Sequence, residues 1–350
     1  MASLPNSFDS PADPQPAQEG PQTPQNSSLS RRSAEGIAAI SPSLYFDESQ
    51  GVYCSYNGYN RFDPVNKAFI KFDPNSPTPS AVAFGIVQAN FARGRNLRLK
   101  AKSDVLRNDG FTAIMETWGG GQSQVVSAGI MWLTLGTPEM AGFQTGVVDT
   151  NMEHSPRECL PTPTEMEVKF PTAFSAAPEV VLWIRGFHIG QSVSGSEDWS
   201  LHVSAENVSS DGFCLTISRE DSSKLYRAIV TWVAFPKDRA NVFHGIESGT
   251  KDDICQWETQ YNQRNGFTRL VNLQCQREKQ GCTASEFRVY FGITSFHFKG
   301  DASVQFQVEV EKLDVEDEES RQNRFHVHVG AWHSSHMLKA SASWLAVYRP

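Results

Sequence analysis

One short pattern occurs three times in this chain of 350 residues, and its recurrence limits the possible folds more than any single residue does. Each copy ends in an apolar run around a tryptophan, at residues 131–135, 231–235 and 343–347. A phenylalanine lies 19 to 21 residues before each tryptophan, at Phe111, Phe213 and Phe325. An earlier apolar anchor also recurs, at 82–86, 180–184 and 289–293. Three anchors in the same order predict three tandem repeats, each about 100 residues long, which is the size of a small domain.

The recurrence sets the expected organisation of the chain. We predict a tail at residues 1–42, repeat 1 at 43–137, repeat 2 at 138–238 and repeat 3 at 239–350. The tail is rich in Pro, Ser, Gln and Asn. Such a segment buries too little apolar surface to offset its ordering entropy, so we expect disorder there. The joins at 136–139 and 236–239 are short and polar. Links this short favour one compact assembly.

Apolar runs between Gly, Asn and Asp residues predict strands throughout the repeats. These runs lie at 81–86, 97–101, 111–117, 124–135, 168–170, 179–186, 199–205, 212–218, 224–235, 286–298, 304–313, 324–330 and 337–348. No amphipathic helix longer than about ten residues is evident. Short strands separated by turn residues are typical of β-sandwiches. We therefore predict an all-β fold of three antiparallel β-sandwich repeats, with an acidic hairpin tip near 314–323.

Composition excludes several classes of function. The net charge of −8 and a pI near 5.6 argue against nucleic acid or an anionic membrane as a partner. No apolar run is long enough to span a membrane. The chain starts without a conventional signal peptide, so we expect it to be cytoplasmic or exported by another route. The six cysteines do not recur between repeats, which favours reduced thiols, although Cys275 and Cys282 are close enough to pair.

Particular sequence strings give the pattern a family resemblance. Residues 168–235 contain KFP, a PxVVLWI strand, SAENVSSDGF and a closing VTWVAF. Repeat 1 has AFIKF, NLRLKA, NDGF, ETW and IMWLTL, and repeat 3 keeps AWHSS and ASWLAV. Together these strings resemble the H-type lectin domain, the module of snail agglutinins and of the C-terminal half of discoidins. No single string is specific, so the resemblance depends on their ordered recurrence over about 300 residues.

The resemblance implies both an assembly and a ligand. Family members are small antiparallel β-sandwiches that form parallel trimers, with a sugar site at each boundary between subunits. They bind galactose or N-acetylgalactosamine without catalysis or cofactor. A chain with three copies is therefore expected to fold as a pseudo-trimer by itself and to stay monomeric, because three exposed apolar faces can cover one another. Its expected partners are glycans or glycoproteins with terminal Gal or GalNAc.

The family's binding residues can be carried over by position. An arginine thirteen residues before the recurring phenylalanine matches Arg98 in repeat 1. Ser200 takes that position in repeat 2, and Gln305 takes it in repeat 3 by a gapped alignment. A sugar-binding aspartate is expected after the first strand, where Asp63 is the nearest candidate.

The family's Trp-His pair follows the recurring phenylalanine. Repeat 1 keeps only the tryptophan, as Trp118, and repeat 3 keeps both residues, as Trp332 and His333. Repeat 2 has Glu220 and Asp221 instead. Repeat 1 is thus the best expected site and repeat 3 the second, while repeat 2 is expected to be structural. The closing tryptophans Trp132, Trp232 and Trp344 are assigned to packing.

The residue types suit a sugar, but each has a simpler interpretation. An aromatic ring covers the apolar face of a pyranose, and an arginine donates directed hydrogen bonds to hydroxyls. An aspartate accepts charge-assisted ones. Arg98 is equally compatible with a surface position on a strand. The alternative function is a structural or protein-interaction scaffold whose sugar sites have decayed. We expect no enzyme, because the common catalytic motifs are absent.

Repeat 3 also gathers histidines. His326 and His328 share one face of a predicted strand, so their imidazoles are able to converge on a metal. No carboxylate or cysteine completes the usual ligand spacing in the sequence. We therefore predict no metal site and no cofactor.

Overall fold

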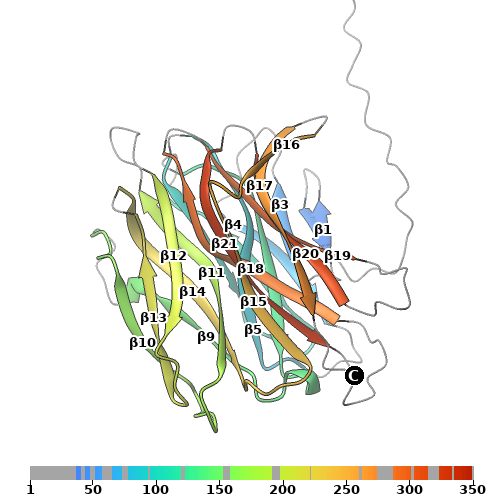
Figure 1. Ribbon diagram of the computed structural model, residues 1–350. Coiled ribbons are helices and arrows are strands. Elements are labelled where there is room, and N and C mark those ends of the chain that lie inside the picture. The colour runs from blue at the N-terminus through green and yellow to red at the C-terminus, as the bar shows by residue number, and fades with distance from the viewer. Residues whose placement is uncertain are drawn as a thin grey trace, which may run out of the picture. The chain divides into compact units, whose positions relative to one another are not determined.

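The computed structural model describes residues 65–72, 78–93, 95–119, 123–152, 158–190, 198–220, 222–259, 262–273, 287–300, 303–313, 323–332 and 335–348 (Figure 1). For the short strands β1 (Ile37–Ile40), β2 (Leu44–Asp47) and β3 (Val52–Tyr56) it describes the backbone alone, as it does for 139, 152, 255–259, 262–264, 312–313 and 323. Asp63, His333, Cys275, Cys282, the tip at 314–322 and residues 1–36 of the predicted tail lie outside the described residues. Strand β1 begins before the predicted tail boundary at residue 42.

The described chain is almost entirely antiparallel β-structure. Repeat 1 continues with β4 (Val65–Lys71), β5 (Ala81–Phe91), β6 (Leu97–Ser103), β7 (Gly110–Glu116) and β8 (Val125–Leu135). Repeat 2 carries β9 (Gln144–Asp149), β10 (Thr164–Lys169), β11 (Glu179–Gly190), β12 (Trp199–Glu206), β13 (Gly212–Ser218) and β14 (Lys224–Phe235). Repeat 3 carries β15 (Val242–Thr250), β16 (Cys255–Thr259), β17 (Asn262–Leu273), β18 (Phe287–Phe298), β19 (Val304–Leu313), β20 (Asn323–Trp332) and β21 (Met337–Tyr348).

Two short 3₁₀ helices, η2 (Pro138–Met140) and η3 (Thr150–Met152), interrupt the strands. No helix in the described part of the chain is long and apolar enough to cross a membrane. Each strand predicted from the sequence overlaps an observed strand, and the all-β prediction is confirmed. No predicted run corresponds to β1, β2, β3, β4, β16 or β17. The repeat boundaries themselves stay a prediction.

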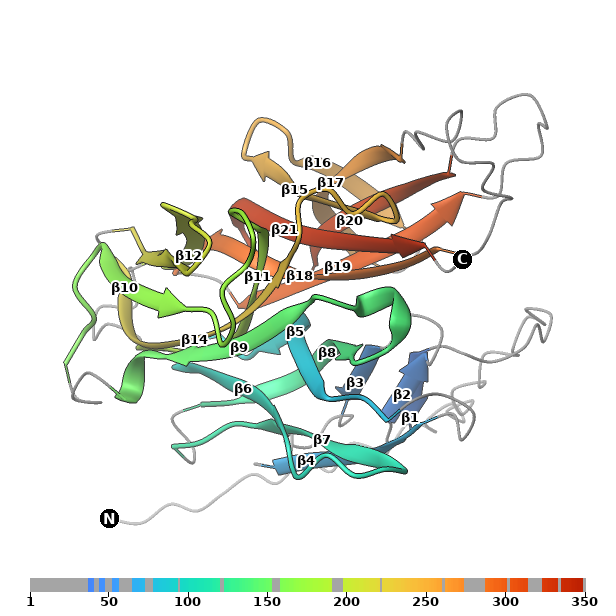
Figure 2. The same ribbon diagram turned by 90° about the horizontal axis from the view of Figure 1, so that it is seen from below.

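The strands form three sheets, and each sheet joins strands of two repeats (Figure 2). One has the order β4-β7-β6-β11-β14-β9 and combines repeats 1 and 2. A second, β10-β13-β12-β18-β21-β15, combines repeats 2 and 3. The third, β1-β2-β3-β8-β5-β19-β20-β17-β16, combines repeats 3 and 1. The three repeats therefore form a closed ring, in which every repeat shares a sheet with both others, as a pseudo-trimer requires.

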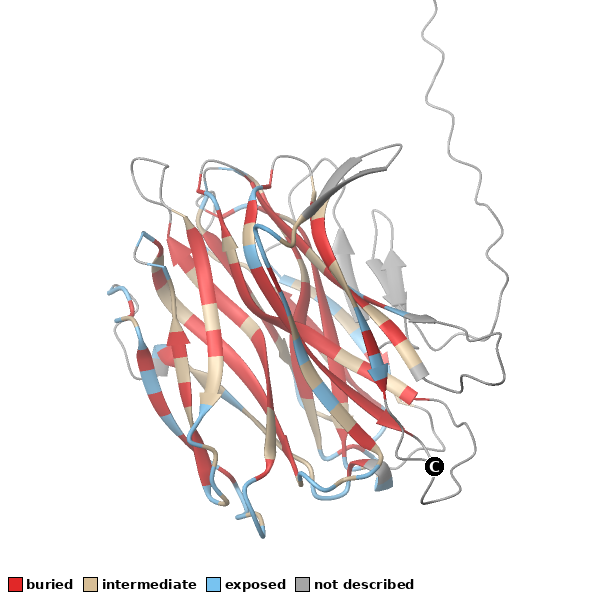
Figure 3. Cartoon of the chain, in the orientation of Figure 1, coloured by how far each residue is buried: buried red, intermediate tan, exposed pale blue. Residues whose placement is uncertain are grey.

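Burial separates central strands from outer ones (Figure 3). Strands β8, β14 and β21 are buried along nearly their whole length, since both of their faces are covered. Strand β10 alternates strictly between buried and exposed residues, because only one of its faces meets the core. The apolar recurrence in the sequence thus marks the strands that form the interior of the assembly.

The recurring phenylalanine and tryptophan meet inside each repeat. Their rings pack edge to face, with centroids 6.1 Å apart for Phe111 and Trp132 and 5.2 Å apart for Phe325 and Trp344. Repeat 2 forms the same pair at 6.0 Å. This geometry is favourable for aromatic pairs. All three tryptophans are buried, so the prediction that they serve packing is confirmed.

The three central anchors meet at one place, where a single large side chain fills the space. Trp183 of β11 is fully buried and lies against Gly85 of β5 and Gly292 of β18, which are the corresponding anchor residues. A Cβ atom added at Gly292 would lie 2.8 Å from Trp183 Cδ1, and one at Gly85 would lie 3.1 Å from Trp183 Cβ. The pseudo-symmetry is therefore broken at its centre, because one indole occupies a space that both neighbours leave free.

Candidate functional site

The predicted binding positions lie where two repeats pair. We call these pairings the first seam (β6 with β11), the second seam (β12 with β18) and the third seam (β19 with β5). Arg98, Ser200 and Gln305, which the sequence analysis aligned with one another, each lie on one side of a seam. Their partners across the seams are His188, His297 and Asn90, in that order. The three seams are thus equivalent positions occupied by different residues.

Arg98 anchors the first seam and joins two repeats. Only 9% of the residue is exposed, so the interpretation of Arg98 as a surface residue is wrong. Its Nε donates to His188 Nε2 at 2.9 Å, and its Nη1 donates to the carbonyl oxygen of Trp118 at 3.3 Å. The structure thus brings the predicted residues Arg98 and Trp118 together, and adds a histidine from repeat 2.

A glycine after Trp118 makes this contact possible. Gly119 has φ near +89°, a conformation that other residues rarely adopt. A Cβ atom at Gly119 would lie 1.5 Å from Arg98 Nη1. The guanidinium therefore occupies the space that the missing side chain leaves, and the glycine run in the sequence has a defined steric role at its first position.

His188 is neutral in this surrounding. Burial, and to a smaller extent the positive charges of Arg98 and Arg227, together lower its pKa to about 4. A neutral imidazole has a lone pair on one nitrogen, which is what an acceptor for the Arg98 N–H requires. The imidazole also stacks on Tyr226, with ring centroids 4.9 Å apart and planes inclined by 29°.

Charged side chains surround the Trp118 ring. Lys100 Nζ lies 5.8 Å and Arg227 Cζ lies 5.9 Å from its centroid, at the outer edge of the cation–π range. Arg227 forms a bidentate ion pair with Asp149 at the end of β9. Lys100 pairs with Glu116 at 2.7 Å. The first seam therefore offers an aromatic ring, hydrogen-bond donors and a carboxylate within one group of residues.

The second seam has neither arginine nor an aromatic ring in the corresponding positions. The hydroxyl of Ser200 accepts a hydrogen bond from the backbone N–H of Glu220 at 2.7 Å, and its backbone N–H donates to Ser223 Oγ at 3.0 Å. Across the seam, His297 Nε2 lies 2.9 Å from Asp198 Oδ2. These polar groups bond to one another. The expectation that repeat 2 is structural stays a prediction, and its strand β11 supplies His188 to the first seam.

The third seam is intermediate. Gln305 is buried, and its Nε2 donates to Ser303 Oγ at 3.2 Å. Its Oε1 has no hydrogen-bond partner within the described part of the chain. Trp332, at the end of β20, is partly buried, and its carbonyl accepts from the Ser335 N–H. His333 and Asp63 are outside the described residues, so their predicted roles stay predictions.

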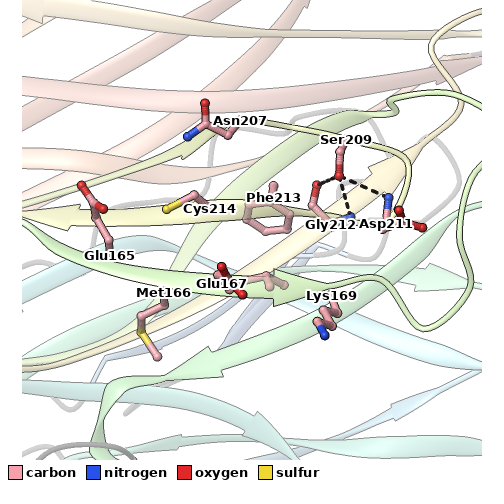
Figure 4. A pocket seen from close by; sticks show the side chains of 11 residues that line it. Glu165, Met166, Glu167, Lys169, Asn207, Ser209, Asp211, Gly212, Phe213 and Cys214 are labelled. Atoms are coloured by element: carbon pink, nitrogen blue, oxygen red, sulfur yellow. Dashed lines mark hydrogen bonds between the residues drawn. The ribbon is translucent and has the colours of Figure 1, made fainter.

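A hollow elsewhere on the molecule differs from the seams. It has a volume of about 570 Å³ and lies along β10 and the turn before β13, lined by Glu165, Glu167, Lys169, Asn207 and Asp211 among others (Figure 4). Its aromatic residue, Phe213, is buried at 4% exposure. Without an accessible ring or an inward arginine it lacks the groups that recognise a sugar face, so the first seam is the stronger candidate.

Comparison with known proteins agrees with part of this assignment. Residues 165–235, which span β10 to β14, match the sequence model of the H-type lectin domain. This match supports a lectin type of role, and it covers repeat 2 alone. Among solved structures, discoidin II of Dictyostelium discoideum is 13% identical, over 52% of this chain and 86% of that chain, with a TM-score of 0.22. No curated protein matches the chain.

The sequence analysis missed the half of the site that repeat 2 supplies. His188 lies five residues after Trp183, and His297 lies five residues after Gly292. The dipeptides Phe187-His188 and Phe296-His297 thus recur in step with the anchors. This recurrence was a usable signal. Asp149 and Arg227 had none, because only the strand pairing places Arg227 opposite His188 and Asp149 next to Arg227.

Proposed function

We propose that the chain is a non-catalytic carbohydrate-binding protein, with its best site at the first seam, for galactose or N-acetylgalactosamine. The observation that supports this most is the placement of Arg98. It is buried, is held by groups from two repeats, and lies beside the partly exposed Trp118. Burying a charged arginine among neutral groups costs free energy. A ligand that accepts hydrogen bonds from the guanidinium would offset part of that cost.

Arg98 retains donors for a ligand. A guanidinium has five N–H groups. Among the described residues, two of them are used, by His188 Nε2 and by the Trp118 carbonyl. The others suit the vicinal hydroxyls of a pyranose or an acetamido oxygen. In this proposal Trp118 covers the apolar face of the sugar, while Arg227 and Asp149 contact its hydroxyl rim.

The contrast between seams predicts one strong site in each chain. At the positions aligned with Arg98 and Trp118, the second seam has neither the arginine nor the ring, and the third has the ring but not the arginine. A single shallow sugar site of this kind corresponds to a dissociation constant of about 0.1–1 mM. Tighter binding to glycoproteins would need several sites on one body.

Calorimetric titration with N-acetylgalactosamine tests the proposal. We expect Arg98→Ala and Trp118→Ala to weaken binding at least about tenfold, since each removes a group that contacts the sugar. Glu220→Gln is the matched control, because Glu220 takes the Trp118 position at the second seam and its side chain is 58% exposed. If both first-seam variants keep full binding while folded, the site assignment is wrong.

The alternative is a scaffold whose sugar sites have decayed, and the internally bonded second seam favours it locally. Absence of any binding by the wild-type chain at about 10 mM sugar, well above the millimolar range of a weak site, would support the scaffold. Galactose, glucose and N-acetylglucosamine tested in parallel separate a Gal/GalNAc preference from general sugar binding.

A further inference from the structure

Three potential metal ligands converge on the hairpin of β19 and β20, away from the first seam. Glu311 lies on β19, and His326 and His328 lie on β20. One donor atom from each of the three residues lies within 4.8 Å of the others. We propose that these side chains form a zinc site with three protein ligands. The site uses no residue of the proposed sugar site, so each proposal can fail without the other.

The spacing of the donor atoms fits a coordination tetrahedron. Glu311 Oε2 lies 3.3 Å from His328 Nε2 and 3.6 Å from His326 Nδ1. Zinc ligands at about 2.0–2.1 Å in tetrahedral geometry are about 3.4 Å from one another. Two edges of the tetrahedron are therefore already present, and the donor nitrogens of the two imidazoles lie within 4.8 Å of each other.

The same distances fit a simple ion pair less well. A charge-assisted hydrogen bond between an imidazolium and a carboxylate has a length of about 2.7–2.9 Å. The His297–Asp198 contact elsewhere in this chain, at 2.9 Å, shows that length. By contrast, Glu311 Oε2 lies between two imidazoles, in a long hydrogen-bond contact of 3.3 Å with His328 Nε2 and 3.6 Å from His326 Nδ1, which is the arrangement expected around a shared cation.

A neighbouring strand orients one of the ligands. Thr268 of β17 lies directly opposite His328 in the sheet, and its Oγ1 is 2.8 Å from His328 Nδ1. If Nδ1–H donates to this hydroxyl, the lone pair of the ring is on Nε2, the nitrogen that lies nearest Glu311. Histidines that bind metals commonly donate their other ring nitrogen to such a partner, which fixes the tautomer and the ring orientation.

The solvent exposure of the three side chains suits a zinc site with one open coordination position. The side chains of His326 and His328 are 30% and 25% exposed, while that of Glu311 is 63% exposed. Water therefore has access to the fourth position. The set of two imidazoles and one carboxylate suits zinc better than calcium or magnesium, which prefer oxygen ligands alone.

The sequence alone hid this site because its carboxylate lies across the hairpin. His326 and His328 are adjacent in alternation, but Glu311 precedes them by 15 and 17 residues. Antiparallel pairing puts Glu311 opposite His326 and Glu309 opposite His328, on the same face. The prediction that no carboxylate completes the site is therefore wrong, because Glu311 lies beside the two histidines. That the site binds a metal is our proposal.

Zinc uptake by the metal-stripped full chain tests the proposal. After treatment with a chelator, the reduced protein is dialysed against ZnCl₂, and bound zinc is measured by mass spectrometry. We expect His326→Gln and His328→Gln each to bind one zinc ion fewer than wild type. Thr268→Ala should weaken affinity by about 10–100-fold, since it removes the orienting group.

Two further measurements keep the result interpretable. Added zinc should raise the melting temperature of the wild-type chain but not of His326→Gln, because a ligand that binds only the folded state stabilises it. His336→Gln is the matched control, since His336 is an exposed histidine outside the cluster. Equal zinc stoichiometry and equal melting shifts in wild type and both ligand variants would overturn the proposal. A result in which the six cysteines account for all of the bound zinc would overturn it as well.

Discussion

At the scale of single residues, the first seam depends on one protonation state. Arg98 donates to His188 Nε2, and the imidazole accepts only while it is neutral. A protonated ring would instead place a second positive charge 2.9 Å from the guanidinium. Burial of the pair therefore links the conformation of Arg98 to the charge of a histidine from another repeat.

The pKa of His188 carries a pH prediction. It is lowered to about 4 from an ordinary value of 6.5, so the unfolded chain takes up the proton first as pH falls. The stability from this group is therefore complete above about pH 6.5 and is lost as pH falls toward 4. We expect His188→Gln, whose amide oxygen also accepts from Arg98, to have a smaller slope of unfolding free energy between those pH values.

NMR titration of the His188 ring checks the cause directly. Its resonances should titrate near pH 4 in the wild-type chain, and Arg98→Ala should raise that midpoint because one of the repelling charges is gone. Lys102→Ala is the control, since Lys102 pairs with Glu116 rather than with the histidine. A midpoint near 6.5 in the folded wild-type protein would refute this account of the seam.

At the scale of elements, three strands share one irregularity. β5, β11 and β18 each shift register against their closing strand at two matching places, the first directly after the anchor isoleucines Ile86, Ile184 and Ile293. A bulge adds one residue and so reverses the alternation of side chains. Trp183 and His188 lie five residues apart on β11, one before and one after the first shift, so one strand serves both the central contact and the seam.

The sequence predicted most strands but only part of the site. Strand positions followed from apolar runs and turn residues, because burial of a strand on both faces leaves a continuous apolar segment. Arg98 and Trp118 were found through the family resemblance, by their spacing from Phe111 within one repeat. His188, Asp149 and Glu311 were not, because pairing between distant strands brings them to their sites. The local sequence of one strand does not show which distant strand it pairs with or in what register.

The central Trp183 carries a prediction about coupling. Trp183→Ala should lower the unfolding free energy by about 3–5 kcal/mol by leaving a cavity. Gly292→Ala should lower it by about 1–3 kcal/mol, because the new Cβ would lie 2.8 Å from Trp183 Cδ1. In the Trp183→Ala background the glycine substitution should cost much less. Urea unfolding of the four proteins gives the coupling energy, and purely additive losses would argue against the central packing.

At the scale of the whole molecule, the seams close within one chain. Each repeat shares a sheet with both others, so the inner strands β6, β11, β12, β18, β19 and β5 have partners on both sides. Among the outer strands, β10 exposes Glu165, Glu167 and Lys169. Charged residues along an edge strand discourage pairing with another chain. A second copy of the protein is therefore not needed to complete any seam.

The closed arrangement and the unequal seams together predict the mass and valency of the protein. Light scattering should give the mass of one chain, 38.9 kDa, because no seam is left open for a partner. Calorimetry should give about one N-acetylgalactosamine per chain, since the first seam alone has both the arginine and the tryptophan at the aligned positions. A protein with one site has no avidity and should not cross-link beads that carry the sugar. A stable trimer of chains would contradict the closure argument, whereas three equal sugar sites per chain would contradict the ranking of the seams.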